Sequence, residues 1–320
     1  MKNVKIGIVG CGNWGKKILK NLLELNVLYK VFDQNLELLS QIPIPNEFKS
    51  KNINNVIDDP EIHGVIISTP PKTHKDIAIK SIENDKHVFI EKPFCLSISE
   101  ADQIIKTAKK YKKIIFVGHL LHYHNGFIKL KEIINKNKIG RISIIKANRL
   151  NFGLIRQDES VIYDLASHDI SMILSITKSM PKKVSVNSLF INSKQFPDLV
   201  NIVLSFDNNV FAIINSDWMS PYKEHRFSVY GKKGSLIFDD TKCWDKKLCF
   251  NPSTIKKNLT INRKQDSFIS FKNEQPLKKE IKSFINCIIK NKQPMTNHEE
   301  ALKVQKVISM IEKQIINKNL

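Results

Sequence analysis

The sequence has few cysteines and no long apolar run. Its five cysteines are scattered and none forms a Cys-x-x-Cys pair, so neither a disulfide framework nor a zinc ribbon is expected. No apolar stretch reaches the roughly 18–20 residues needed to cross a bilayer, and residues 1–6 lack the pattern of a signal peptide. We therefore expect a cytoplasmic protein with reduced thiols and no membrane partner.

Acidic residues are also scarce. The chain has 31 Asp and Glu and 51 Lys and Arg, which gives a formal net charge of +20. Such an excess could indicate binding to nucleic acid. The basic residues are spread along the whole chain, without a basic arm, a zinc-finger spacing or an RNA-recognition motif. We interpret them as a solvated surface that could also attract an anionic substrate, and we expect no nucleic-acid partner.

The order of expected elements predicts two domains of an α/β protein. Apolar runs and helical patterns alternate through the first 118 residues, which is typical of a doubly wound parallel sheet with helices on both faces. Short β-rich runs follow from 183 to about 238, and two helices close the chain, the last one beginning at Asn297 with Glu300 in its first turn. We expect a parallel domain over residues 1–119 and an α+β domain with a large, mostly antiparallel open sheet over 120–320.

A glycine motif follows the first expected strand and opens the first helix. It reads Gly10-Cys11-Gly12-Asn13-Trp14-Gly15. In this position the first glycine permits a tight turn, the second lets the backbone approach a pyrophosphate, and the third lets helix and strand pack closely. The alternative is a glycine turn without a ligand. The motif predicts a Rossmann dinucleotide-binding domain, with the pyrophosphate at the positive end of the helix.

Asp33 ends the second expected strand, at about the 20-residue distance from the glycines that dinucleotide-binding domains show. A carboxylate there can accept hydrogen bonds from both hydroxyls of the adenosine ribose, and it would repel a 2′-phosphate. The alternative is an aspartate that only forms a turn. We predict that NAD is preferred over NADP.

Three further motifs contain candidate functional residues. Glu91-Lys92-Pro93 follows the strand 87–90, and ligands of open parallel sheets collect beyond the carboxyl ends of the strands. Ser68-Thr69-Pro70-Pro71, with His74 shortly after, follows another strand. Later in the chain, Asp164 and His168 are four residues apart in Asp-Leu-Ala-Ser-His-Asp, so on a helix they share one face. Alone, Lys92 would be a surface lysine and His168 a core histidine.

Together these motifs resemble the glucose–fructose oxidoreductase, inositol dehydrogenase and rhizopine-catabolism (Gfo/Idh/MocA) family over essentially the whole chain. The resemblance implies that Lys92 and His168 are the catalytic pair, and that Asp164 holds the substrate or orients His168. It also implies a cofactor site that combines the glycine motif and Asp33 with residues of the two other N-terminal motifs: Ser68, Thr69, Pro70, His74, Glu91 and Lys92. One departure is Ala166, where many members have glycine.

A narrower resemblance points to the branch similar to UDP-N-acetylglucosamine 3-dehydrogenases. It rests on the segment His119–His124 and on Asn148–Gly153, although that branch often has serine at the position of Asp164 and proline at that of Ser167. It implies that Arg149 contacts a substrate diphosphate, since a guanidinium suits phosphate geometry; the alternative is an arginine on a strand surface. His119, His122 and His124 have no one-face spacing, so we expect no metal.

These features lead to one expected activity and two alternatives. We expect an NAD-dependent dehydrogenase that oxidises a secondary hydroxyl of a sugar to give a ketosugar. The expected substrate is a nucleotide sugar such as UDP-N-acetylglucosamine, oxidised at the 3-position. The alternatives are an inositol or free-sugar dehydrogenase of the same family and a non-enzymatic NAD-sensing regulator on the same fold. The family resemblance also implies a homodimer or homotetramer that pairs through the C-terminal sheet.

Overall fold

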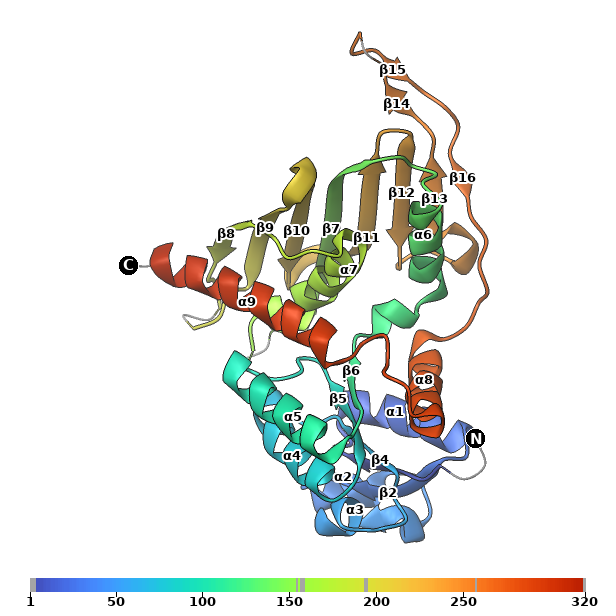
Figure 1. Cartoon of the computed structure of the whole chain (residues 1–320), viewed down its shortest axis with the longest axis vertical. Helices are drawn as coiled ribbons and strands as arrows, with labels where there is room; N and C mark the ends of the chain where they lie inside the picture. Colours follow the sequence, from blue (N-terminus) through green and yellow to red (C-terminus); the bar gives the residue numbers. More distant parts are fainter. Residues whose placement is uncertain (1–3, 154, 156–158, 193–194, 257, 319–320) are drawn as a thin grey trace. The chain divides into compact units, whose positions relative to one another are not determined.

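The computed structural model describes residues 4–153, 155, 159–192, 195–256 and 258–318. The chain forms two compact units (Figure 1). The first consists of residues 1–123 together with 275–305, and the second of residues 124–274 together with 306–320. No helix of the described residues is long and apolar enough to cross a membrane.

A six-stranded parallel sheet forms the first unit, in the order β3-β2-β1-β4-β5-β6. The order reverses between β1 and β4, and this is where Rossmann domains bind their ligands. Its strands are β1 (Ile6–Val9), β2 (Leu28–Phe32), β3 (Lys49–Ser50), β4 (Gly64–Ile67), β5 (His87–Glu91) and β6 (Ile115–Gly118). The sheet confirms the predicted parallel Rossmann domain.

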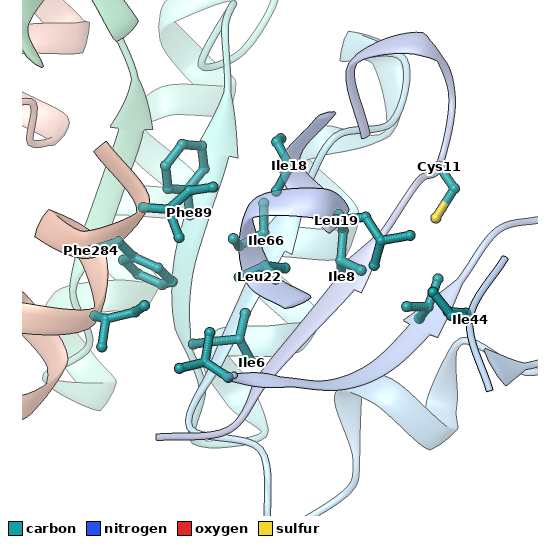
Figure 2. Packing of buried hydrophobic residues seen from close by; sticks show 14 of the residues in the cluster. Ile6, Ile8, Cys11, Ile18, Leu19, Leu22, Ile44, Ile66, Phe89 and Phe284 are labelled. Atoms are coloured by element: carbon teal, nitrogen blue, oxygen red, sulfur yellow. The ribbon is translucent and has the colours of Figure 1, made fainter. Parts of the chain in front are cut away.

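Side chains of the central strands alternate between two apolar clusters, one on each face of this sheet. On β5, Phe89 faces one cluster while Val88 and Ile90 face the other, because successive side chains of a strand point to opposite faces. Figure 2 shows the first cluster, in which Ile18 and Phe284 pack beside Phe89. Both faces of the sheet are therefore buried by helices.

Helices cover both faces of this sheet in the part of the chain that the structure describes. The cluster that contains Phe89 is closed by α1 (Asn13–Glu24), α2 (Leu36–Gln41) and α8 (Pro276–Lys290), and the opposite cluster by α3 (Asn54–Ile57), α4 (His74–Glu83) and α5 (Ile98–Tyr111). α8 returns from the far end of the sequence to lie beside α1. Its Phe284 stacks edge-on against Phe89 and Phe116, so residues 275–305 belong to the first unit although the sequence placed them in the second domain.

The second unit is built on an eight-stranded sheet in the order β16-β13-β12-β11-β7-β10-β9-β8. All neighbours are antiparallel except β7 and β10, which run parallel. Its strands are β7 (Ile142–Phe152), β8 (Lys183–Leu189), β9 (Leu199–Ser205), β10 (Phe211–Asp217), β11 (Met219–Gly231), β12 (Gly234–Asp239), β13 (Leu248–Asn251) and β16 (Ser267–Phe268). The predicted large, mostly antiparallel sheet is confirmed.

Helices α6 (Asn125–Asn135) and α7 (Ser167–Thr177) lie against one face of the eight-stranded sheet (Figure 1). The short hairpin of β14 (Thr254–Ile255) and β15 (Ile261–Asn262) extends from the β13 side. The long C-terminal helix α9 (His298–Lys318) begins in the first unit and ends in the second. Asn297 accepts hydrogen bonds from the backbone of Glu299 and Glu300, which confirms the predicted helix start.

Candidate active site

The glycine motif forms a tight loop between β1 and α1. Gly10 has a φ of +97°, which disfavours any side chain, and a Cβ on Gly15 would lie 2.2 Å from the carbonyl oxygen of Gly10. A Cβ on Gly12, in contrast, would meet no atom within 4 Å. Gly10 and Gly15 are thus required by packing, whereas Gly12 leaves open backbone next to the N-terminus of α1. This geometry fits the pyrophosphate of a dinucleotide, with Asn13 and Trp14 in the first turn of α1.

Asp33 follows β2 and faces the glycine loop. Its Oδ2 accepts a hydrogen bond of 2.6 Å from the backbone N–H of Cys11, and its Oδ1 accepts one of 2.8 Å from Asn35. The carboxylate is half-buried. Asp33 therefore supports the glycine loop and still presents a carboxylate at the carboxyl edge of the sheet.

The loop after β4 is tied to its neighbours by Ser68 and His74. Ser68 donates from Oγ to the carbonyl of Gly10 at 2.7 Å. The ring nitrogens of His74 lie 2.9 Å from the carbonyl oxygens of Pro93 and Thr69. Burial lowers the pKa of His74, against the raising effect of these two carbonyls. Its neutral ring can donate to only one of these carbonyls at a time. The two contacts connect the loop after β4 to the turn that contains Pro93. Thr69 is half-buried and Pro70 is exposed in this loop.

Glu91 and Lys92 lie at the carboxyl end of β5 and differ in how far they are exposed to solvent. Lys92 is half-buried, whereas Glu91 is 8% exposed. Oε1 of Glu91 accepts a hydrogen bond of 2.6 Å from Nε1 of Trp14, and Oε2 accepts one of 3.3 Å from the backbone N–H of Lys92. The Glu91 side chain therefore connects the glycine loop to the turn that carries Lys92.

Two of the three histidines of segment 119–124 lie beside Glu300, and the third has other partners. His119 pairs through Nδ1 with Oε2 of Glu300 at 2.5 Å, and Nε2 of His122 lies 3.8 Å from Oε1 of the same residue. His124 accepts from the N–H of Gly126 at the start of α6 and lies 3.4 Å from Asp240. No group of three potential metal ligands occurs among the described residues.

In the second unit, Asp164 and His168 lie at a helix irregularity. Ile162–Ala166 forms a turn of π-helix that continues directly into α7. Asp164 and His168 are half-buried, while Ala166, Ser167 and Asp169 are buried. Oδ2 of Asp164 accepts a hydrogen bond of 3.3 Å from Nε1 of Trp218. The structure therefore brings Asp164 and His168 onto one short segment, and π-turns of this kind often occur at functional sites.

Arg149 has a different environment from the one expected for a diphosphate ligand. It lies on the same face of β7 as the buried Ile145 and Ala147, and it is only 7% exposed. Its Nε and Nη2 each donate a 2.9 Å hydrogen bond to Asp169, which is 1% exposed. Burial works against the charge of Arg149, but Asp169, together with Asp240 and Asp164, outweighs it and raises the pKa of the guanidinium. Arg149 thus forms a buried bidentate ion pair with the residue after His168.

The candidate residues divide between the two units. The first unit holds the glycine loop, Asp33, the loop of Ser68 to His74, and Lys92, and the second holds Asp164, His168 and Arg149. The sequence analysis assigned no supporting role to three residues: Trp218, Asp169 and Glu300. Asp169 and Glu300 are acids that the sequence analysis already mentions. Their partners, Arg149 for Asp169 and His119 for Glu300, are distant from them in sequence.

Comparison with known proteins agrees with the order of a parallel Rossmann sheet followed by a large, mostly antiparallel sheet. Residues 4–119 match the model of the oxidoreductase family with an NAD-binding Rossmann fold, and residues 127–237 match the GFO/IDH/MocA C-terminal domain. The chain belongs to the Gfo/Idh/MocA oxidoreductase family.

Relatives in this family have different substrates. The chain is 24% identical to myo-inositol 2-dehydrogenase of Thermotoga maritima, over 75% of its own length and 76% of that protein. It is 27% identical to scyllo-inositol 2-dehydrogenase (NAD(+)) of Bacillus subtilis, over 59% and 58%. The crystal structure of UDP-N-acetylglucosamine 3-dehydrogenase from Acidithiobacillus ferrooxidans aligns with a TM-score of 0.83 at 20% identity, covering 97% of both chains. The likeness to the solved structure shows the fold alone, and these similarities leave the substrate and the choice between NAD and NADP open.

Proposed function

We propose that this protein is an NAD-dependent dehydrogenase that oxidises a secondary hydroxyl of a sugar to a ketone. The observation that carries the proposal is the half-buried Lys92 at the carboxyl end of β5, connected through Glu91 to the glycine loop. A binding domain alone does not need a lysine held in this position. NAD, when bound, accepts a hydride from the substrate carbon.

The residues of the chain would share the remaining tasks. Gly12 and the start of α1 would hold the pyrophosphate, with Asp33 on the adenosine ribose. His168 would accept the proton of the substrate hydroxyl as a general base, and Asp164 would hold the sugar or orient His168. The positive charge of Lys92 would polarise the hydroxyl and stabilise the negative charge that develops on its oxygen.

We propose NAD as the preferred cofactor because of Asp33. Its carboxylate lies at the carboxyl edge beside the glycine loop, where a 2′-phosphate would meet a second negative charge. Titration of the protein with NAD and NADP tests this proposal. Tighter binding of NADP would contradict it.

For the substrate, we propose a nucleotide sugar such as UDP-N-acetylglucosamine, oxidised at the 3-position, with inositol or a free sugar as the second candidate. The first is supported by the basic charge of the chain and by the fold likeness to a UDP-N-acetylglucosamine 3-dehydrogenase. The second is supported by the inositol dehydrogenases among the relatives. The ion pair with Asp169 occupies the Nε and Nη2 of Arg149, so the diphosphate contact expected of this residue carries no weight here.

We also propose that the protein forms a homodimer or homotetramer through the open face of the eight-stranded sheet. Half-buried asparagines cross three strands of this face, with Asn201 donating to Asn215, and Asn215 donating to Asn148 at 2.8 Å. Light scattering after size-exclusion chromatography tests this proposal. Asn215→Arg should lower the molecular mass to that of a monomer.

One experiment separates enzyme from sensor. NADH formation is measured with UDP-N-acetylglucosamine, myo-inositol and free sugars, for the wild type and for Lys92→Ala. We expect turnover with one of these substrates and a loss of roughly 10²–10⁴-fold in the variant, with NAD affinity nearly unchanged. Unchanged turnover in Lys92→Ala would reject the mechanism, and the absence of any turnover in the wild type would favour the NAD-sensing regulator.

A further inference from the structure

Glu91 occupies a fixed position between two functional segments. Besides its hydrogen bonds to Trp14 and Lys92, its carboxylate lies against the backbone of β6 at Gly118, its register partner. A Cβ added to Gly118 would lie 2.8 Å from Oε2 of Glu91. The carboxylate is therefore enclosed by α1, the Lys92 turn and β6.

Charged groups near Glu91 come from the Lys92 turn, from the residue after β6 and from α8. Lys92 follows it in sequence, and His119, paired with Glu300, follows Gly118 on β6. From α8 comes Glu280, which is completely buried. Within the part of the chain that the structure describes, neither carboxyl oxygen of Glu280 has a hydrogen-bond partner.

Two buried carboxyl groups that interact are costly to ionise together. Burial raises the pKa of Glu91 to about 7, although Trp14, Lys92 and His119 each act to lower it. Burial and the charge of Glu91 raise the pKa of Glu280 well above its ordinary value. The pair therefore favours a state in which only one of the two carboxyl groups is ionised. Because Glu91 accepts two hydrogen bonds and the oxygens of Glu280 accept none among the described residues, the negative charge of this state falls on Glu91.

We propose that Glu91 is a positioning residue whose negative charge holds the glycine loop and the Lys92 turn together, and that the His119–Glu300 pair supports this charge. The proposal rests on the proposed dehydrogenase function only for its effect on turnover. Its effect on cofactor affinity needs no sugar. Because the charge-assisted bonds to Trp14 and Lys92 weaken when Glu91 is protonated, NAD affinity should rise as the pH increases through about 7.

Trp14 offers a direct reporter of this ionisation, since its indole N–H donates to Glu91. The chain has three tryptophans, so Trp218→Phe with Trp244→Phe leaves Trp14 as the one indole. In that background, we expect Trp14 fluorescence to titrate with a midpoint near pH 7, and NAD affinity, measured by calorimetry, to follow the same midpoint. Glu91→Gln should abolish both transitions.

Three further variants test the neighbours. His119→Asn should raise the midpoint, because a group that lowers the pKa of Glu91 is lost. Glu300→Gln should raise it as well, because His119 loses the carboxylate with which it pairs. Glu280→Gln should leave the midpoint in place, since a neutral amide replaces a protonated acid, and the exposed Glu83→Gln is the matched control. Both His119→Asn and Glu300→Gln keep Glu91 itself, so they test the proposal even if Glu91→Gln does not fold.

The outcomes are distinct. A Trp14 titration that survives Glu91→Gln, or an NAD affinity that stays flat while Trp14 titrates, would overturn the proposal. A midpoint that does not rise in His119→Asn would overturn the role of the His119–Glu300 pair. Failure of every sugar to be oxidised would reject the proposed function and would leave the titration and the NAD affinity as they are.

Discussion

The Arg149–Asp169 pair provides a sharp test of how the second unit is held together. Both side chains are almost fully buried and joined by two 2.9 Å hydrogen bonds. Removing one partner leaves the other charge buried without compensation, which costs about 3–5 kcal/mol of stability. Arg149→Met keeps an unbranched, flexible side chain, although a shorter one, and removes the charge. We therefore expect its free energy of unfolding to fall by about 3–5 kcal/mol.

Replacing both partners should be much less harmful than replacing one. In Arg149→Met with Asp169→Leu no unpaired charge remains, and well-packed apolar substitutes for a buried ion pair are often neutral or stabilising. The double variant should thus be more stable than either single variant. Arg226→Met is the control, because Arg226 lies on β11 with 48% of its side chain exposed and with ion-pair distances of 3.4 and 3.6 Å. It should cost about 0–1 kcal/mol.

The assay is urea unfolding followed by circular dichroism, with the free energy extrapolated to water. A loss below about 1 kcal/mol in Arg149→Met, or losses of the two single variants that simply add in the double variant, would refute the reasoning. The same proteins should bind NAD normally, since the glycine loop lies in the other unit. Turnover, in contrast, should fall in both single variants because Asp169 directly follows His168.

Three other predictions concern the first unit. Gly12→Ala should fold normally but weaken NAD binding roughly tenfold or more, whereas Gly15→Ala should lower the melting temperature, because only the second Cβ meets backbone. Asp33→Ser should shift the ratio of NAD to NADP affinity, measured by calorimetry, toward NADP; an unchanged ratio would contradict the role of Asp33. Burial lowers the pKa of His87 to about 4, and its Nδ1 accepts from the N–H of Ile114. The unfolded chain thus binds the proton first, so stability should fall as the pH drops from 6.5 towards 4; this slope, followed by urea unfolding, should flatten in His87→Asn.

Local rules account for much of the first unit. The strand–glycine–helix order fixed the Rossmann domain, because Gly10 and Gly15 are required by backbone geometry alone. The start of α5 also depends on a local contact, since Oγ of Ser97 accepts a hydrogen bond from the backbone N–H of Glu100. These contacts join residues only a few positions apart, and for that reason a single sequence reveals them.

Contacts between distant segments could not be predicted. The alternation Ile145, Ala147, Arg149 indicates that Arg149 shares a buried face, but no local pattern names Asp169 as its partner. Likewise, the apolar face of α8 is evident in the sequence, whereas its place against Phe89 depends on how the chain returns to the first sheet. The spacing of Asp164 and His168 predicts that they share a helix face, but it does not distinguish an α-helix from the π-turn found before α7.

Lys92 and His168 share one local design, although they lie in different units. Each is half-buried, and each has an acidic sequence neighbour that is nearly inaccessible and bound to another element of its own unit. Glu91 contacts Trp14 of α1, and Asp169 contacts Arg149 of β7. A reactive side chain must reach substrate while its backbone stays in place. The buried acid next to each proposed catalytic residue keeps the backbone in place. Substitutions at Glu91 and Asp169 should therefore lower turnover although neither residue touches the substrate.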